Sequence, residues 1–228
     1  MEKLPKIKIL YEDNHLLVVV KPINIPVQKD SSNDIDLLTM LKDYLRQKYN
    51  KQGNVYLGLV QRLDRPVGGV MVFAKTSKAA SRLSEQIRKC EIKKEYLAVV
   101  LGNLKIEDTL IDYLIKNNKT NITTVTTDEK KGKKAILSYS LIEKKDNLNL
   151  VKINLVTGRS HQIRVQFSSR GNPLYGDMKY NIKAKAGENV ALWCKKISFL
   201  HPTKKELVVF ESDYPSFYPF NIFYKKNS

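Results

Sequence analysis

Short apolar runs separated by turn residues constrain this chain more than any other feature. Four such runs follow one another in the middle of the chain, at residues 95–102, 121–127, 135–143 and 150–158. The last run alternates apolar and polar residues with the two-residue period of a half-buried strand. Two more runs lie near the C-terminus, and residues 7–22 contain two strand-like runs, the second stopped by Pro22. The pattern predicts a large β-sheet.

Two segments carry apolar residues at helical spacing. The first helix is predicted to be capped by Asp34 and to run to about Tyr49, and the second to be capped by Thr76 or Ser77. Their buried faces are predicted to consist of Leu38, Leu41 and Leu45 in the first helix and of Ala80, Leu83 and Ile87 in the second.

Strands and helices together predict an α+β fold with a large mixed, mostly antiparallel sheet flanked by helices and loops. No internal repeat, low-complexity tract or Pro/Ser-rich linker marks a boundary, so residues 1–228 are predicted to form a single domain. A hydrophobic fraction of 42% and a charged fraction of 28% are typical of a globular protein.

The charge of the chain favours an anionic partner. Forty Lys and Arg against 23 Asp and Glu give a formal net charge of +17, which attracts polyanions such as nucleic acid. The alternative is a general lysine richness that only keeps the protein in solution. The longest aliphatic run, residues 16–20, is too short to cross a membrane, so no membrane partner is expected. The two cysteines, Cys90 and Cys194, form no paired motif, which favours the reducing cytoplasm.

Motifs for metal, phosphate or serine-nucleophile chemistry are missing from the sequence. The three histidines lie far apart, so we expect no metal and no cofactor. GRSHQIR (residues 158–164) is predicted to open a short helix that Ser160 caps and Gly171 closes. Its basic residues Arg159 and His161 would suit a phosphate contact at the helix N-terminus.

The stretch QRLDRPVGGV (residues 61–70) places Asp64 between Arg62 and Arg65. Nearby positive charge favours the ionised carboxylate, which serves as a nucleophile or an electrostatic stabiliser rather than as a general acid. The alternative is that Asp64 only holds a turn by pairing with one of the two arginines. The proline and the glycine pair that follow are typical of a tight loop, because proline fixes φ and glycine tolerates positive φ.

QRLDRPVGGVMVFAKT is similar to the signature of the RluA-type pseudouridine synthases, which isomerise uridines in ribosomal and transfer RNA. Further segments match in the same order along nearly the full chain: ILYEDNHLLVVVKP, KKEYLAVVLG, TGRSHQIRVQ, GNPLYGDMKY and ISFLHPT. The resemblance implies the pseudouridine synthase catalytic fold and an RNA isomerase that needs no cofactor and acts on rRNA or tRNA. The alternative is a non-catalytic RNA-binding or RNA-folding protein with the same fold.

The resemblance also implies roles for single residues. Asp64 would be the catalytic aspartate, and Tyr96 would stack on the target uracil near the proton that leaves C5. Arg164 would pair with Asp64, and Arg62 would contact the RNA near the space left by the extruded base. Tyr96 could instead be a core aromatic residue, and Arg164 a phosphate contact on the helix surface.

Three positions depart from the family pattern. Gln61 stands where His is common, Gly68 where Ser is common, and Trp193 where many relatives have His. These changes concern the choice of substrate rather than the reaction. Many relatives carry a small basic RNA-binding domain before the catalytic one, whereas here the catalytic pattern starts by about Ile7. We therefore expect no separate N-terminal domain, RNA binding by the catalytic domain itself, and a monomer.

Overall fold

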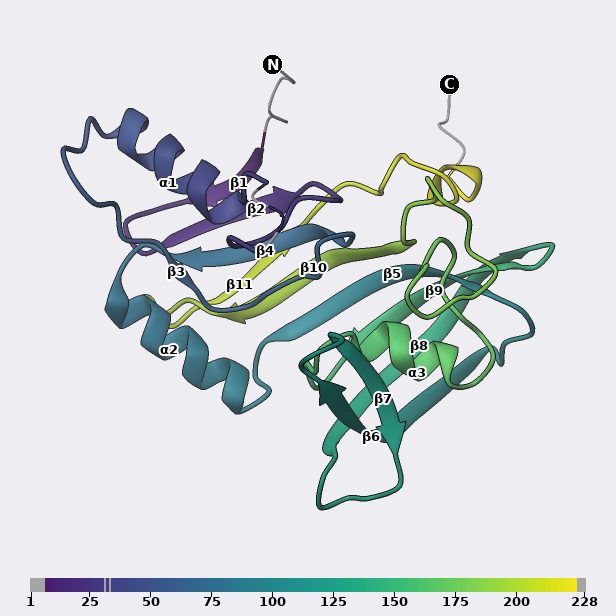
Figure 1. The fold of residues 1–228 in the computed structure, drawn as a ribbon. Helices are drawn as coiled ribbons and strands as arrows, with labels where there is room; N and C mark the ends of the chain where they lie inside the picture. The colour runs from purple at the N-terminus through teal and green to yellow at the C-terminus, as the bar shows by residue number, and fades with distance from the viewer. Residues whose placement is uncertain (1–6, 31, 33, 225–228) are drawn as a thin grey trace. The chain divides into compact units, whose positions relative to one another are not determined.

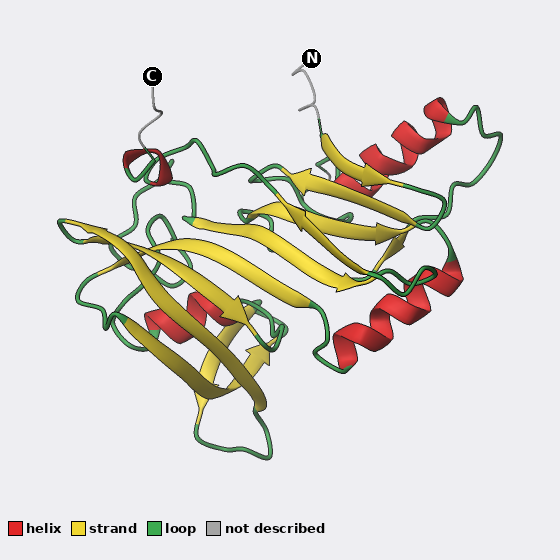
Figure 2. Ribbon diagram, turned by 180° about the vertical axis from the view of Figure 1, so that it is seen from behind, coloured by secondary structure: helices red, strands yellow, loops and turns green. Residues whose placement is uncertain are grey.

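The computed structural model describes residues 7–30, 32 and 34–224, and the chain forms two compact units. The first unit comprises Met1–Ile92 and Lys196–Ser212, and the second comprises Lys93–Lys195 and Asp213–Ser228. Figure 1 shows the elements in chain order, and Figure 2 shows them by type from the opposite side. The single domain expected from the sequence stays a prediction.

The first unit is a β-sheet with two helices. Its elements are β1 (Lys8–Glu12), β2 (Leu16–Lys21), α1 (Leu37–Lys48), β3 (Gly58–Leu59), β4 (Gly68–Ala74), α2 (Ser77–Arg88), β11 (Leu207–Glu211) and the end of β10 (Leu192–Leu200). Strand β2 pairs antiparallel with β1 and β4, the short β3 pairs with β4, and β11 pairs with the end of β10. Within residues 55–64 the only strand is the two-residue β3.

One face of this sheet packs against α2. Leu16 and Val18 of β2 and Val70 of β4 form a buried cluster with Leu83 of α2. Helix α1 lies on the opposite side of the sheet from α2 (Figures 1 and 2). The three predicted apolar positions of α1 divide, because Leu41 and Leu45 are buried while Leu38 is half-buried.

The caps of these helices match the sequence prediction in one case and correct it in the other. Thr76 caps α2, since its side chain accepts a hydrogen bond from the Ala79 amide at 3.2 Å. Helix α1 is capped by Asp36 rather than Asp34, through a 3.0 Å bond from the Thr39 amide. Asp36 is the aspartate that directly precedes the first helical residue.

The second unit is a twisted antiparallel sheet with strand order β5-β9-β8-β6-β7. Its elements are β5 (Lys93–Leu101), β6 (Glu107–Asn117), β7 (Ile122–Thr126), β8 (Lys133–Lys145), β9 (Leu148–Leu155), α3 (Gln162–Ser168), the start of β10 and the 3₁₀ turn η1 (Phe220–Ile222). The register sets Tyr96 of β5 opposite Ile153 of β9, and Ile153 opposite Tyr139 of β8. Side chains opposite each other share a face of the sheet, so the two tyrosines lie on the same face.

Helix α3 packs with Val165 against Leu114 of β6 and Ala135 of β8. Its end is the glycine-closed turn that the sequence predicts. The amide of Gly171, at φ 75°, donates to the Ser168 carbonyl, and the next amide donates to the carbonyl of residue 167. The predicted cap at Ser160 is wrong, because the residue before the helix is His161, which has φ 53° and makes no side-chain cap bond.

The predicted α+β class is confirmed, and the strand pairs described above are antiparallel. Strand β6 (Glu107–Asn117) was not predicted. Among the described residues no helix could cross a membrane, since α1 and α2, the longest of them, have 12 residues each.

Candidate active site

The loop that carries Asp64 belongs to the first unit and leads into β4. The amide of Val67 donates to the Asp64 carbonyl at 3.0 Å, which closes a turn over Arg65 and Pro66. Asp64 is half-buried. Gly69, the second residue of β4, has φ 115°, a conformation that favours glycine at this one position of the pair.

A buried lysine lies behind this loop. The side chain of Lys21, the last residue of β2, has no solvent exposure. Its ammonium donates hydrogen bonds to the carbonyls of Pro22 at 3.0 Å, Arg65 at 2.9 Å and Val67 at 2.7 Å. The three protons of the ammonium are therefore used by main-chain oxygens, and two of these belong to the turn that begins at Asp64.

The electrostatic effect of Asp64 reaches this lysine. Burial lowers the pKa of Lys21 from 10.5 to about 7, while the negative charge of Asp64 opposes the shift and the positive charge of Arg65 adds to it. Sequence reasoning did not select Lys21. The available signal was a lysine at the end of an otherwise apolar strand, because a charged residue is buried only where it finds partners.

The two arginines next to Asp64 in the sequence have different surroundings. Arg62 is exposed. Arg65 is held by groups earlier in the chain: its guanidinium donates to Ser32 at 2.9 Å and forms an ion pair with Asp34. The hydrogen bond from Arg65 holds the pKa of Asp34 below its usual value. Asp34, the predicted helix cap, is thus a partner of Arg65.

Tyr96 and Arg164 both belong to the second unit. Tyr96 lies on β5 and is 6% exposed, and its phenol hydrogen-bonds the thiol of Cys194. Burial raises the pKa of Cys194 to about 12, with the bond from Tyr96 opposing the shift. A tyrosine in this position is compatible with a core role as well as with stacking on a base, so its predicted role stays a prediction.

Arg164 of α3 forms a two-pronged ion pair with Asp177. Its Nε donates to Oδ2 at 2.8 Å and its terminal nitrogen donates to Oδ1 at 2.7 Å, and both side chains are buried. The ring of Tyr180 lies 5.2 Å from the guanidinium carbon. Asp177 was not selected from the sequence, although it lies in GNPLYGDMKY. The predicted pairing of Arg164 with Asp64 stays a prediction.

His161 and Arg159 lie before α3 in the same unit. The Tyr180 hydroxyl accepts a hydrogen bond from the Thr123 amide at 2.9 Å and shares a second hydrogen bond with Nδ1 of His161 at 2.6 Å. Arg159 is exposed, and its Nε donates to the Lys134 carbonyl at 2.9 Å. Their predicted contact with RNA phosphate stays a prediction.

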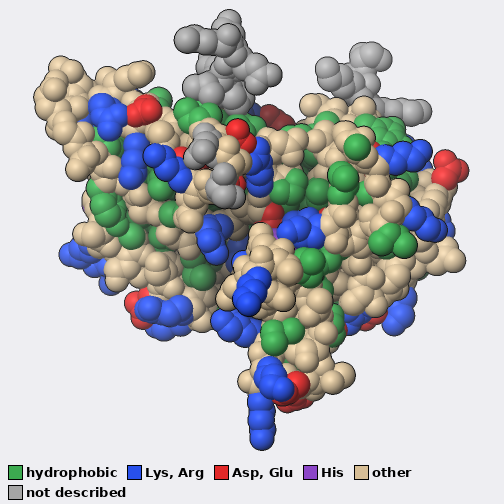
Figure 3. Space-filling model, viewed as in Figure 1, with side chains coloured by type: hydrophobic (Ala, Val, Ile, Leu, Met, Phe, Trp, Pro, Cys, Tyr) green, Lys and Arg blue, Asp and Glu red, His purple; other side chains and the backbone are tan. Residues whose placement is uncertain are grey.

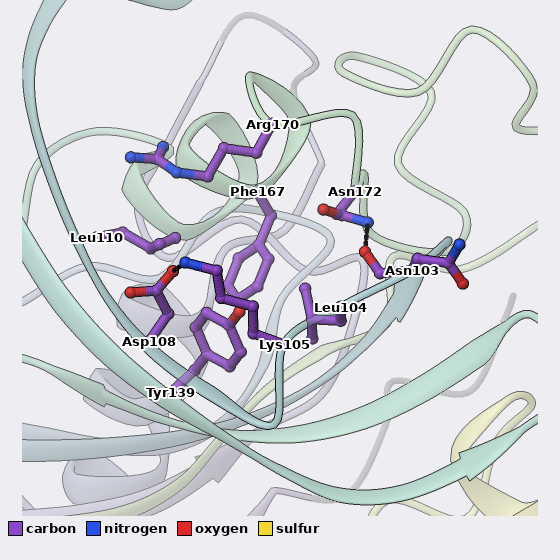
Figure 4. A pocket seen from close by; sticks show the side chains of 9 residues that line it. All are labelled: Asn103, Leu104, Lys105, Asp108, Leu110, Tyr139, Phe167, Arg170 and Asn172. Carbon is purple, nitrogen blue, oxygen red and sulfur yellow. Dashed lines mark hydrogen bonds and ion pairs between the residues drawn. The ribbon is translucent and has the colours of Figure 1, made fainter.

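A pocket of about 350 Å³ lies at the C-terminal end of α3 (Figure 4). It is lined by Tyr139 and Phe167 and by the ion pair of Lys105 and Asp108, whose charged atoms lie 3.0 Å apart. The six residues predicted from the sequence do not line it. Within residues 7–30, 32 and 34–224, no group of three or more His, Cys, Asp or Glu side chains could hold a metal ion.

Comparison with known proteins identifies the family. A family model described as RNA pseudouridylate synthase matches residues 15–169. An uncharacterized RNA pseudouridine synthase of Bacillus subtilis, YhcT, is 32% identical over 213 residues, covering 92% of this chain and 70% of that protein. The ribosomal large subunit pseudouridine synthase C of Buchnera aphidicola is 33% identical over 210 residues, covering 88% of this chain and 65% of that protein.

Comparison with solved structures finds a similar fold. The structure of human RNA pseudouridylate synthase domain containing 4 matches with a TM-score of 0.79 at 20% identity, covering 95% of this chain and 92% of that one. The chain spans about two thirds of the length of the two bacterial relatives. The family-model match covers Asp64, Tyr96 and Arg164 together. The chain belongs to the RNA pseudouridylate synthase family, and within it to the RluA type that its sequence predicts.

Proposed function

We propose that this protein is an RNA pseudouridine synthase that isomerises particular uridines in rRNA or tRNA, with Asp64 as the catalytic carboxylate. The observation that carries the proposal is the family match over residues 15–169, which includes all three residues expected to act on the uridine. The excess of basic residues supports an RNA substrate. Lys and Arg side chains spread over the molecular face drawn in Figure 3, where acidic side chains are sparse.

The reaction exchanges one bond of the nucleoside for another. The bond between N1 and C1′ breaks, the uracil turns, a bond forms between C5 and C1′, and the proton on C5 is lost while N1 gains one. No electrons leave the nucleoside. A base within a stack is out of reach, so the uridine must first be flipped out at a cost of a few kcal/mol.

The family resemblance suggests a role for each residue in this chemistry. Asp64 acts as a nucleophile or as a charge stabiliser, at the ribose or at the base. Stacking of Tyr96 on the flipped uracil would return about 1–3 kcal/mol. Arg164, which is buried in its ion pair with Asp177, supplies positive charge. Arg62, Arg159 and His161 contact the RNA.

Lys21 supports the proposal, because it fixes the main chain on the C-terminal side of Asp64 by contacts to two carbonyls of the turn. A catalytic carboxylate needs such fixed placement, since misplacement by about 1 Å can cost on the order of 100-fold in rate. We further propose that the enzyme works as a monomer in the cytoplasm.

The test is tritium release from RNA labelled at uridine C5. Deproteinised rRNA and tRNA from cells that lack the protein serve as substrates. We expect the wild type and the control Asp43→Ala, at an exposed aspartate of α1, to release label, and Asp64→Ala to release none above background.

Equal release by the wild type and Asp64→Ala would refute the role of Asp64. RNA binding without any release by the wild type would refute the isomerase and favour the non-catalytic RNA-binding alternative. The two outcomes are distinct, because the first leaves the reaction in place.

A further inference from the structure

A loop next to Arg164 exposes apolar side chains among lysines. We call residues 178–185, MKYNIKAK, the basic loop; they contain three lysines and no acidic residue. Ile182 is 100% exposed and Met178 is 62% exposed. A fully exposed branched aliphatic side chain leaves its apolar surface in water, and only contact with a partner would bury that surface.

Hydrogen bonds hold the frame of the basic loop. Asp177, just before it, is fully buried in the pair with Arg164, and its carbonyl accepts from the Asn181 amide at 2.7 Å. The hydroxyl of Ser168 in α3 donates to the Tyr180 carbonyl at 2.6 Å. Figure 1 shows this segment running beside α3. The two exposed apolar side chains are therefore presented by a fixed backbone, which reduces the entropy lost when they meet a partner.

The charge of the basic loop selects the class of partner. Lys179, Lys183 and Lys185 are exposed, and the ammonium of Lys179 donates to the Asn121 carbonyl at 3.1 Å. Lysines beside an exposed aliphatic side chain are suited to a nucleic acid, in which phosphates lie next to apolar base faces. They are also suited to an anionic lipid surface. Two contacts favour RNA: Tyr180 of the basic loop lies over Arg164 and hydrogen-bonds His161. Both partners lie in the segment that the family model matches.

We propose that Ile182, assisted by Met178, is an apolar wedge that packs against the base faces next to the target uridine. When a uridine leaves its stack, its neighbours lose an apolar contact on one side. An aliphatic side chain inserted at that step restores part of the contact and holds the opened strand. The lysines of the basic loop bind the flanking phosphates. This inference rests on the proposed function and adds to it a contact that acts when the stack opens.

The test compares Ile182→Ser and the double variant Met178→Ser/Ile182→Ser with Ile106→Ser. Ile106 is 75% exposed in the same unit, so it controls for the loss of exposed apolar surface. Tritium release from rRNA and tRNA gives kcat/KM, and fluorescence anisotropy gives Kd for the same RNAs and for oligouridine, which has little base stacking to open. We expect Ile182→Ser to lower kcat/KM by about tenfold and to weaken binding of structured RNA to a similar degree. Its binding of oligouridine should be unchanged.

Several results would overturn the wedge. If Ile182→Ser equals Ile106→Ser in an active enzyme, the wedge is wrong while the isomerase stands. An equal loss of affinity for oligouridine would show a general strand contact instead. Binding of wild type to phosphatidylserine vesicles that Ile182→Ser abolishes, with RNA affinity unchanged, would assign the basic loop to lipid. A wild type that releases no tritium removes the proposed function and the wedge with it.

Discussion

Replacing Lys21 by methionine tests how the loop at Asp64 is held. Methionine has a similar length and fits an apolar environment, but it offers no proton to the carbonyls of Pro22, Arg65 and Val67 that Lys21 now bonds. We expect the variant to fold and to lose most of its activity. The loss should be on the order of 100-fold, the cost of moving a catalytic group by about 1 Å.

Two opposing contributions determine how Lys21→Met changes the free energy of unfolding. Each carbonyl left without a donor and out of reach of water costs about 1–3 kcal/mol. In return, methionine removes a buried ammonium whose pKa is lowered from 10.5 to about 7, a shift that corresponds to about 5 kcal/mol against the charged form. Because the terms largely cancel, we expect the free energy of unfolding at pH 6 to change by less than about 3 kcal/mol.

The pH dependence separates the two roles of this lysine. Between pH 7 and 10.5 the unfolded chain still holds the proton that the folded protein has released, so the contribution of Lys21 to stability rises with pH. Activity should move the other way, because the neutral amine has one proton fewer for the three carbonyls. In Lys21→Met both trends are lost.

The assays are tritium release and urea unfolding between pH 6 and 9, with Lys78→Met, at an exposed lysine of α2, as the control. Full activity in a folded Lys21→Met protein would refute the reasoning. Wild-type activity that stays level from pH 6 to 9 would show that the ammonium charge does not hold the loop.

Three further outcomes follow from the contacts. Asp177→Asn should lower the free energy of unfolding by about 3–5 kcal/mol in urea titrations, because it leaves Arg164 buried without its partner charge; Arg170→Met, in a partly exposed pair, should cost no more than about 1 kcal/mol. Burial acts to raise the pKa of Glu12, but hydrogen bonds, first from Lys48, lower it from 4.5 to about 2. The stabilisation that the ionised carboxylate supplies is present above pH 4.5 and is lost as pH falls towards 2, so thermal unfolding of Glu12→Gln should lack this acid slope. Tyr96→Phe should keep RNA affinity in anisotropy titrations and Tyr96→Leu should lose about tenfold, since the stacking surface is the ring; equal affinities would make Tyr96 a core residue.

Local patterns predicted most of the fold. Helix α2 and the strands with regular apolar runs follow from periodicity, which depends on near neighbours in sequence. Strand β6 was missed because Leu110 and Leu114 are buried while Ile111 and Ile115 on its other face are exposed. Apolar residues at spacings of three and four do not show the alternation that marks a strand.

The site could be predicted only where a motif names the residue. Asp64, Tyr96 and Arg164 came from the resemblance, and the family match includes all three. Lys21 and Asp177 were missed because their roles depend on partners elsewhere in the chain. Lys21 meets carbonyls 44 and 46 residues away, and Asp177 meets an arginine 13 residues away. No local sequence pattern indicates such partners. Every residue has a main-chain carbonyl, so the sequence does not distinguish the ones that accept a hydrogen bond from Lys21.

The way Lys21 binds has a consequence for retargeting the enzyme. Its bonds reach backbone oxygens, so the anchor tolerates any residue identity at positions 61, 62 and 65 that leaves the main chain in place. The loop can therefore accept other side chains at these positions while Lys21 still holds its main chain beside Asp64. A library randomised at these three positions is the natural starting point for variants that modify a different uridine.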